Sequence, residues 1–144
     1  MIRKMTPDDA SVVYKIENDS FFEPWSKKQL IKELEHNSFL KHFVYEKDGE
    51  VVGFYIVSHV ADLGEIFTIA VDLDHRGEGI GEKLLNHLIE KCYEANLSEI
   101  WLEASTKNIP AVNLYKKFGF KIQKVRKNYY QKTGEDAYNM IRIL

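Results

Sequence analysis

Three glycines within five positions separate a short apolar segment from the longest amphipathic segment of the chain. They are Gly77, Gly79 and Gly81, and the apolar segment before them covers residues 64–71. After them, up to about Asn96, apolar side chains recur at helical spacing, namely Ile80, Leu84, Leu85, Leu88, Ile89 and Cys92. A strand that turns through glycines into a helix exposes backbone N–H groups at the positive end of the helix dipole, where phosphates bind. This order predicts an α/β chain with an anion-binding turn. The structural alternative is a glycine-eased turn without a ligand.

The glycine spacing fits neither of the two common nucleotide-binding loops. A P-loop ends in Gly-Lys-Ser/Thr, whereas Gly81 is followed by Glu82 and Lys83. A dinucleotide fingerprint needs G-x-G-x-x-G, whereas the glycines of this turn alternate with other residues. Neither a P-loop nor a dinucleotide-binding fold is therefore expected.

The rest of the chain alternates apolar segments with segments of helical spacing. We expect helices from Thr6 to about Asn18 and from Ser26 to about His36, and another that Asn108 opens and Gly119 ends. Strands are expected at residues 42–46, 51–60, 64–71, 99–104, 121–128 and 136–143, the first two joined as a hairpin, with one more strand before the first helix. The order βααβββαβαββ predicts an α/β (α+β) fold. It has a mixed sheet of about seven strands and about four helices over both faces, in one domain spanning residues 1–144.

Composition excludes several classes of function. The 144 residues carry 20 Lys and Arg against 22 Asp and Glu, a net charge of −2, so no general field attracts nucleic acid or a membrane surface. The single cysteine, Cys92, can form no internal disulfide, and the five histidines show no metal-binding spacing. We expect Cys92 in the core and not as a nucleophile, because no motif places a histidine beside it. No segment resembles a signal peptide or membrane span, so a cytoplasmic protein without metal, nucleic-acid or membrane partners is expected.

Two segments resemble the signatures of a known family. Residues 76–81, Arg-Gly-Glu-Gly-Ile-Gly, are similar to the R/Q-x-x-G-x-G/A motif of the GCN5-related N-acetyltransferases (GNAT). Residues 108–120 resemble the N-x-x-A-x-x-L-Y-x-x-x-G-F segment of the same family. The two motifs occur in the family's order, and the similarity spans nearly the whole chain. The resemblance implies the GNAT fold and the transfer of an acetyl group from acetyl-CoA to an amine.

The resemblance implies roles for two side chains in this reaction. Glu103 corresponds to the base that takes a proton from the amine through a water, and Tyr115 to the acid that protonates the departing CoA thiolate. A protein α-amine has a pKa of about 7.7 to 8.0, so a modest base suffices near neutral pH. The residues alone leave alternatives open. Glu103 can be a solvated strand residue, and Tyr115 can belong to the apolar stripe of its helix.

The resemblance also implies which residues bind acetyl-CoA. The strand at 69–71 is expected to bind the pantetheine arm and to offer the Val71 N–H to the oxyanion, and the glycine turn is expected to bind the pyrophosphate. Asn108 is expected both to reach the pantetheine arm and to cap its helix. The complete set is Ile69, Ala70, Val71, Arg76, Gly77, Glu78, Gly79, Ile80, Gly81 and Asn108.

A narrower resemblance concerns the acceptor. Residues 24–26, 69–72, 101–103, 128–130 and 134–137 are similar to those GNAT members that acetylate the N-terminal alanine of a small-subunit ribosomal protein. Phe22, Trp25, Tyr129 and Tyr130 resemble residues that contact a peptide N-terminus, although aromatic residues at these places can also close the edge of the core. The expected partner is therefore a protein or peptide N-terminus, with a ribosomal protein as the candidate.

Two other functions stay open. The same fold can acetylate a small amine or a lysine side chain, in which case its groove needs acidic groups for a second positive charge. A non-catalytic acyl-CoA-binding module is the other alternative. Basic residues around the two tyrosines, Lys121, Lys124, Arg126, Lys127 and Lys132, are interpreted as a solvated strand face and not as an RNA site. The arginine that these relatives carry two residues after the glutamate is replaced by Ser105.

Overall fold

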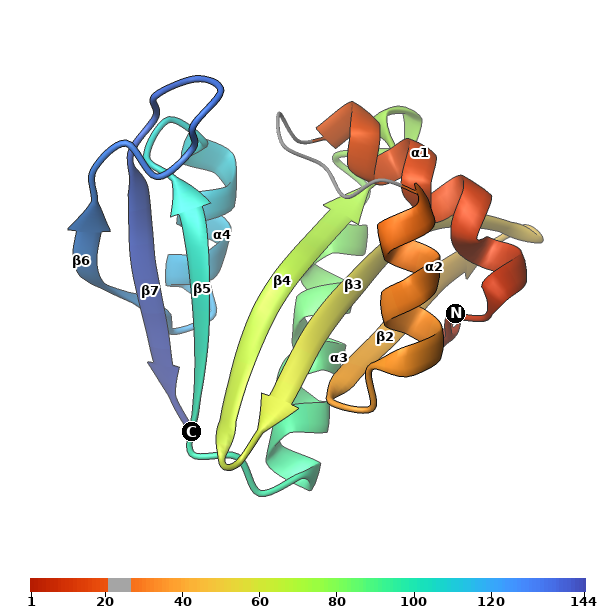
Figure 1. The fold of residues 1–144 in the computed structure, drawn as a ribbon, viewed down its shortest axis with the longest axis horizontal. Helices are drawn as coiled ribbons and strands as arrows, with labels where there is room; N and C mark the ends of the chain where they lie inside the picture. Colours follow the sequence, from red (N-terminus) through yellow and green to blue (C-terminus); the bar gives the residue numbers. More distant parts are fainter. Residues whose placement is uncertain (21–26) are drawn as a thin grey trace.

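One mixed sheet of seven strands organises the protein (Figure 1). The computed structural model describes residues 1–20 and 27–144. The strands lie in the order β1-β2-β3-β4-β5-β7-β6. Their bounds are β1 Ile2–Lys4, β2 Leu40–Lys47, β3 Glu50–Val60, β4 Leu63–Val71, β5 Glu99–Ser105, β6 Lys121–Arg126 and β7 Ala137–Ile143. All neighbours pair antiparallel except β4 and β5, which are parallel. The expected fold class and mixed sheet are confirmed.

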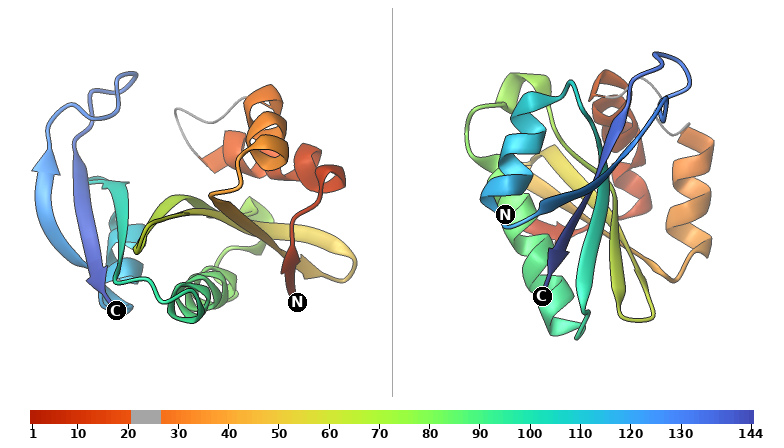
Figure 2. Two further views of the ribbon diagram at one scale, coloured as in Figure 1. Left: turned by 60° about the horizontal axis from the view of Figure 1, so that its bottom comes forward. Right: turned by 90° about the vertical axis from the view of Figure 1, so that its left-hand side faces the viewer.

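Helices cover both faces of the sheet (Figures 1 and 2). On one face lie α1, Ala10–Ser20, and α2, Lys27–His36. On the other lie α3, Ile80–Glu94, the longest helix, and α4, Ile109–Lys117. No helix formed by residues 1–20 or 27–144 is both long and apolar enough to cross a membrane.

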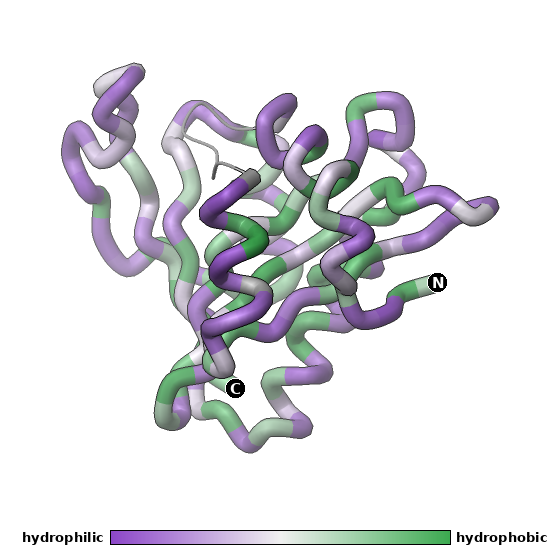
Figure 3. Tube along the Cα trace, turned by 45° about the vertical axis from the view of Figure 1, so that its right-hand side comes forward, coloured by the Kyte–Doolittle hydropathy of each residue, from purple (hydrophilic) through white to green (hydrophobic). Residues whose placement is uncertain are grey.

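Apolar side chains form a core on each side of the central strands. Towards α3, the buried cluster includes Tyr55, Leu84, Leu88 and Ile100, and towards α1 and α2 it includes Phe54. Strand β3 is buried on both faces, because its residues alternate between the two clusters. The helices mix hydrophobic with hydrophilic residues along their length, as expected for elements that bury one face (Figure 3).

Several element ends differ from expectation by one or two residues. The first helix opens with a 3₁₀ turn at Pro7–Asp9, in which Asp9 accepts the Thr6 N–H at 2.8 Å. Strand β4 begins one residue earlier than expected. Strand β6 ends at Arg126 and not at Asn128, because Asn128 takes a left-handed φ of 51° and donates its N–H to Asp136 Oδ1 at 2.9 Å. That hydrogen bond turns the chain out of the ladder and starts the loop between β6 and β7.

The parallel pair at the centre of the sheet is short, and this divides the sheet. Pairing of β4 with β5 runs from Leu63 opposite Glu99 to Ile66 opposite Leu102, and then stops. Both strands continue beyond this point, β4 to Val71 and β5 to Ser105. The two strands diverge in Figure 1 from their paired ends near the C-terminus. Backbone groups on the facing edges of both strands are therefore left without a ladder partner among the described residues where the sheet opens.

Candidate active site

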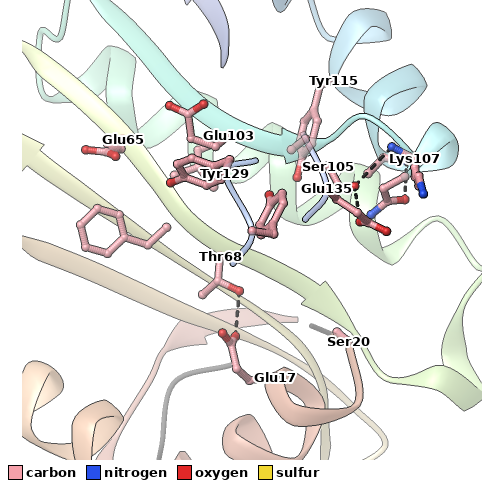
Figure 4. A pocket seen from close by; sticks show the side chains of 16 residues that line it. Glu17, Ser20, Glu65, Thr68, Glu103, Ser105, Lys107, Tyr115, Tyr129 and Glu135 are labelled. Carbon is pink, nitrogen blue, oxygen red and sulfur yellow. Dashed lines mark hydrogen bonds between the residues drawn. The ribbon is translucent and has the colours of Figure 1, made fainter. Parts of the chain in front are cut away.

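A cavity of about 710 Å³ lies where β4 and β5 separate. Its walls come from α1, β4, β5, the start of α4 and the loop between β6 and β7 (Figure 4). Five of the residues expected to function from the sequence line it together, namely Glu103, Tyr115, Asn108, Tyr129 and Tyr130. The cavity is completed by Glu17, Ser20, Glu65, Ile66, Phe67, Thr68, Ala104, Ser105, Lys107, Ala111 and Glu135.

The two carboxylate oxygens of Glu103 differ in their hydrogen bonds. Its Oε1 accepts hydrogen bonds from Arg126 Nε at 3.1 Å and from Asn139 Nδ2 at 3.0 Å. Its Oε2 is buried and has no hydrogen-bond partner among the described residues. The side chain is 16% exposed, so Glu103 is not the solvated strand residue that the alternation alone allowed. A buried carboxylate oxygen without a protein donor can accept a proton, or a hydrogen bond from a water or a bound molecule.

Tyr115 reaches the cavity from the opposite face of the sheet. It belongs to α4 and packs in the core on Phe120, with ring centroids 5.8 Å apart. The side chain is 9% exposed, and it lines the same cavity as Glu103 (Figure 4). The ring is thus a core residue, as the apolar stripe of the helix indicates, and the side chain also borders the cavity. Burial, with a smaller contribution from Tyr130, raises the pKa of the Tyr115 hydroxyl, which keeps it a proton donor at neutral pH.

The wall opposite Glu103 and Tyr115 carries a buried polar pair (Figure 4). Thr68 of β4 donates its hydroxyl to Glu17 Oε2 of α1 at 2.8 Å, and both residues are buried. At the end of β5, the Ser105 hydroxyl donates to Glu135 Oε1 at 2.7 Å. The cavity is therefore lined by four glutamates, of which Glu65 is the fourth. The sequence did not indicate the three other than Glu103, because they lie on separate elements.

The free edge of β4 offers backbone groups to a ligand. Asp72 N–H donates to Val52 O at 2.8 Å, which identifies that pair as hydrogen-bonded in the antiparallel ladder with β3. Hydrogen-bonded and non-bonded pairs alternate, so Val71 and Ile69 turn their N–H and C=O groups away from β3 and towards the opening. Ala70 instead faces β3 with these groups. The edge therefore suits an extended ligand arm and presents the Val71 N–H.

The glycine turn is open, and two of its residues take a left-handed backbone conformation that favours glycine. Gly77 and Gly79 have φ of 81° and 79°, and a Cβ at either position meets nothing within 4 Å. Gly79 is the N-cap residue of α3, so the first N–H groups of a 15-residue helix point out of this turn. Arg76 donates to the Val71 carbonyl at 3.2 Å and thereby ties the turn to the end of β4.

Two residues of the turn can act only through their backbone. The Glu78 carboxylate pairs with Lys47, which lowers the pKa of Glu78, so this charge is directed at the hairpin of β2 and β3. The Ile80 side chain is 3% exposed and belongs to the core. Gly81 lies close to α4, because a Cβ there would meet Leu114 and Val71 at 3.8 Å.

Asn108 caps α4 as expected. Its Oδ1 accepts the Ala111 N–H at 3.4 Å, and Pro110 follows in the first turn. Asn108 also lines the cavity, so one side chain is placed for the cap and borders the opening between β4 and β5.

The expected acceptor residues fall into two groups. Tyr129 and Tyr130 line the cavity from the loop after β6, with rings 5.0 Å apart at 89°. Tyr129 is 44% exposed, so it does not close the edge of the core. Phe22 and Trp25 lie outside the described residues.

Two residues of the site were missed or misread in the sequence. Arg126 was grouped with a solvated basic face, but it forms an ion pair with Glu103. Asn139 was not singled out, yet it is fully buried and bonds to Glu103. The available signal was an asparagine inside the apolar segment 136–143, because buried amides require partners.

Cys92 is buried in the core as expected, but one reason given for its inertness is wrong. The structure places His59 Nε2 3.8 Å from Cys92 Sγ. Burial raises the pKa of the Cys92 thiol to about 11, and burial lowers the pKa of His59. Because the thiol is a weaker acid and the histidine a weaker base than usual, proton transfer between them is unfavourable, and Cys92 is inert for an electrostatic reason. Within the described part of the chain, no group of three or more His, Cys, Asp or Glu is placed to hold a metal ion.

Comparison with known proteins agrees with this geometry. The model of the acetyltransferase (GNAT) family matches residues 10–120. A Bacillus subtilis (strain 168) protein, provisionally named a ribosomal protein bS18-alanine N-acetyltransferase, is 40% identical over 139 residues, covering 96% of this chain and 92% of that protein.

Two solved structures are closely similar. The ribosomal-protein-S18-alanine N-acetyltransferase of Escherichia coli superposes with a TM-score of 0.90 at 32% identity, covering 99% of this chain and 92% of that chain. Ard1 of Thermoplasma volcanium also has a TM-score of 0.90, at 33% identity over 100% of this chain and 97% of that chain.

Proposed function

Because the chain belongs to the GNAT family of acetyltransferases, we propose that it transfers an acetyl group from acetyl-CoA to the α-amino group of a protein N-terminus. The acceptor is the N-terminal alanine of a small-subunit ribosomal protein. Support comes from the names of the Bacillus and Escherichia relatives, whose sequence and structure match nearly the whole of this chain.

One observation carries the proposal. The carboxylate of Glu103 and the side chain of Tyr115 border the same cavity, both on its β5 and α4 side, across from Thr68 of β4. A base and an acid at one opening are what an amine and a departing thiol require.

The residues present fit acetyl-CoA. The unpaired edge of β4 at Ile69 and Val71 suits the pantetheine arm, and the N–H groups at the start of α3 suit the pyrophosphate. Backbone donors bind an anion without a basic surface, which agrees with the net charge of −2. Acetyl-CoA supplies the acetyl group as a thioester, whose sulfur leaves as a thiol.

The protein's own groups balance the protons of this transfer. The amine nitrogen forms a bond to the acetyl carbon, the bond from that carbon to sulfur breaks, and one proton must leave the nitrogen. Glu103 Oε2 accepts that proton through a water and then releases it to solvent. The Tyr115 hydroxyl gives one proton to the sulfur and recovers one from solvent. The Val71 N–H stabilises the negative charge that develops on the acetyl oxygen.

The carboxylates of the cavity also favour a second candidate. Glu17, Glu65 and Glu135 line the groove beside Glu103. Acidic groups are what a polyamine or a lysine-bearing acceptor would need for its additional positive charge. Acetylation of a small amine or a lysine side chain is therefore the alternative to be tested.

A single experiment distinguishes these acceptors. The purified chain is incubated with acetyl-CoA and a mixed panel of alanine-starting peptides, internal-lysine peptides with blocked N-termini, and polyamines. Mass spectrometry should show acetyl groups on the α-amine of the alanine-starting peptides. Acetylation of only the lysine peptides or polyamines would contradict the proposed acceptor. Binding of acetyl-CoA without any product would contradict catalysis itself.

Replacing Tyr115 with Phe should lower kcat about 10- to 100-fold, because the ring stays in the core and only the proton donor is lost. The dissociation constant of acetyl-CoA should stay within a factor of about two. Since burial raises the pKa of Tyr115, the wild-type rate should show no loss from Tyr115 ionisation up to about pH 10. Steady-state kinetics from pH 6 to pH 10 and calorimetric titration measure these quantities.

The matched control is Tyr93→Phe. Tyr93 is half-exposed on α3, and removal of its hydroxyl breaks only a hydrogen bond from Arg142. This variant should have the wild-type kcat. Equal rates for Tyr115→Phe and Tyr93→Phe would eliminate the acid role.

A further inference from the structure

The two oxygens of the Glu103 carboxylate lie in different environments, and the difference originates on β6 and β7. Oε1 receives two hydrogen bonds, from Arg126 Nε and from Asn139 Nδ2. Oε2 receives none from the described residues, although it is buried. Two donors on one oxygen fix both the position and the rotation of the carboxylate. The second oxygen is thereby left without a donor from the described residues, on a side chain that lines the cavity.

Asn139 is placed for this contact by strand register. It lies directly opposite Glu103 in the antiparallel pair of β5 and β7, so the two side chains stand on the same face of the sheet. The Asn139 side chain is fully buried, and its Oδ1 has no hydrogen-bond partner among residues 1–20 and 27–144. A buried amide that leaves its own oxygen unsatisfied costs stability. The side-chain hydrogen bond that Asn139 does make is the one it donates to Glu103.

Arg126 supplies the positive charge that pairs with the Glu103 carboxylate. It is the last residue of β6, opposite Ala137 and two places along β7 from Asn139, and it reaches across β7 to Glu103. Its side chain is 39% exposed, so its guanidinium can be changed without opening the core. Lys124 lies on β6 like Arg126 and is opposite Asn139 of β7. It has no hydrogen bond or ion pair with Glu103.

We infer that Asn139 and Arg126 are positioning residues that hold Oε1 of Glu103 and so direct Oε2 at the acceptor amine or its water. This inference rests on the proposed function, because it assumes that Glu103 is the base. The inference adds to the proposed function that the rotation of the Glu103 carboxylate matters as well as its presence. The carboxylate must be held in one rotation, because proton transfer depends on a short and well-aligned contact.

The test combines single variants with the Glu103→Gln background. Asn139→Leu keeps the volume and removes the donor, and should lower kcat about tenfold with the KM for acetyl-CoA within about twofold of wild type. In the Glu103→Gln background, Asn139→Leu should change kcat less than about twofold, because no basic oxygen remains to be directed. A merely structural role would instead lower kcat by the same factor in both backgrounds, and that result would overturn the inference.

Variants of Arg126 keep the test decisive if Asn139→Leu does not fold. Arg126→Met should lower kcat about tenfold, whereas Arg126→Lys, which keeps the charge, should recover most of that loss. Lys124→Met is the matched control, since it removes a charge from the same strand, and it should have the wild-type kcat. Equal losses for Arg126→Met and Lys124→Met would also overturn the inference.

The outcomes separate the inference from the proposed function. If Glu103→Gln lowers kcat while both Asn139→Leu and Arg126→Met are fully active, the base stands and the positioning is wrong. If Glu103→Gln has the wild-type kcat, the proposed base is wrong and the inference fails with it.

Discussion

Replacing Glu103 with Gln should lower kcat/KM for an alanine-starting peptide about 100- to 1,000-fold at pH 7. The amide has nearly the shape of the carboxylate. Its oxygen can keep the hydrogen bonds from Arg126 and Asn139, while its NH₂ group replaces the basic Oε2. The substitution therefore removes the base with little disturbance of the site. Thermal unfolding should show a melting temperature within a few degrees of wild type.

The deficit of Glu103→Gln should become smaller towards pH 9. A protein α-amine has a pKa of about 7.7 to 8.0, so at the higher pH most of the acceptor is already neutral and needs less help from a base. The matched control is Glu99→Gln at the opposite end of the same strand, which should have the wild-type rate throughout. Wild-type activity of Glu103→Gln from pH 6 to pH 9 would rule out the base role.

Replacing Gly79 with Val should raise the dissociation constant of acetyl-CoA at least about 100-fold. The expected cause is backbone conformation and not a steric clash, because a Cβ at Gly79 meets open space while φ is 79°. A β-branched residue strongly avoids this region, so the first turn of α3 must rearrange and the N–H groups that it presents must move. Isothermal titration calorimetry with acetyl-CoA measures the loss.

Gly49→Val is the control for backbone strain. Gly49 has the same φ of 79° and the same open surroundings, but it lies in the turn between β2 and β3. Both variants should lose a comparable amount of stability, about 1 to 3 kcal/mol, whereas only Gly79→Val should lose acetyl-CoA affinity. Unchanged affinity in Gly79→Val, or equal losses in the two variants, would mean that the turn does not hold the pyrophosphate.

The sequence predicted the elements of the fold well because their signals are local. Period-2 and period-3.6 patterns, caps such as Asn108 and the stop at Gly119 predicted, in the correct order, the strands and α-helices that the described residues form. The end of β6 differs from the prediction because of one hydrogen bond between neighbouring parts of the chain. Asn128 leaves the ladder because Asp136, eight residues later, accepts its N–H, and no pattern in the sequence announces that bond.

The sequence by itself indicated Glu103, Tyr115 and the glycine turn as candidate site residues, because the motifs that point to them are short and ordered along the chain. Only the tertiary structure decided how they meet. Glu103 and Tyr115 approach from opposite faces of the sheet and share a cavity because pairing of β4 with β5 ends at Ile66 and Leu102. Likewise, Arg126 and Asn139 reach Glu103 across 23 and 36 positions of chain. Contacts of that range depend on which distant strands become neighbours in the sheet, and a local pattern does not show that pairing.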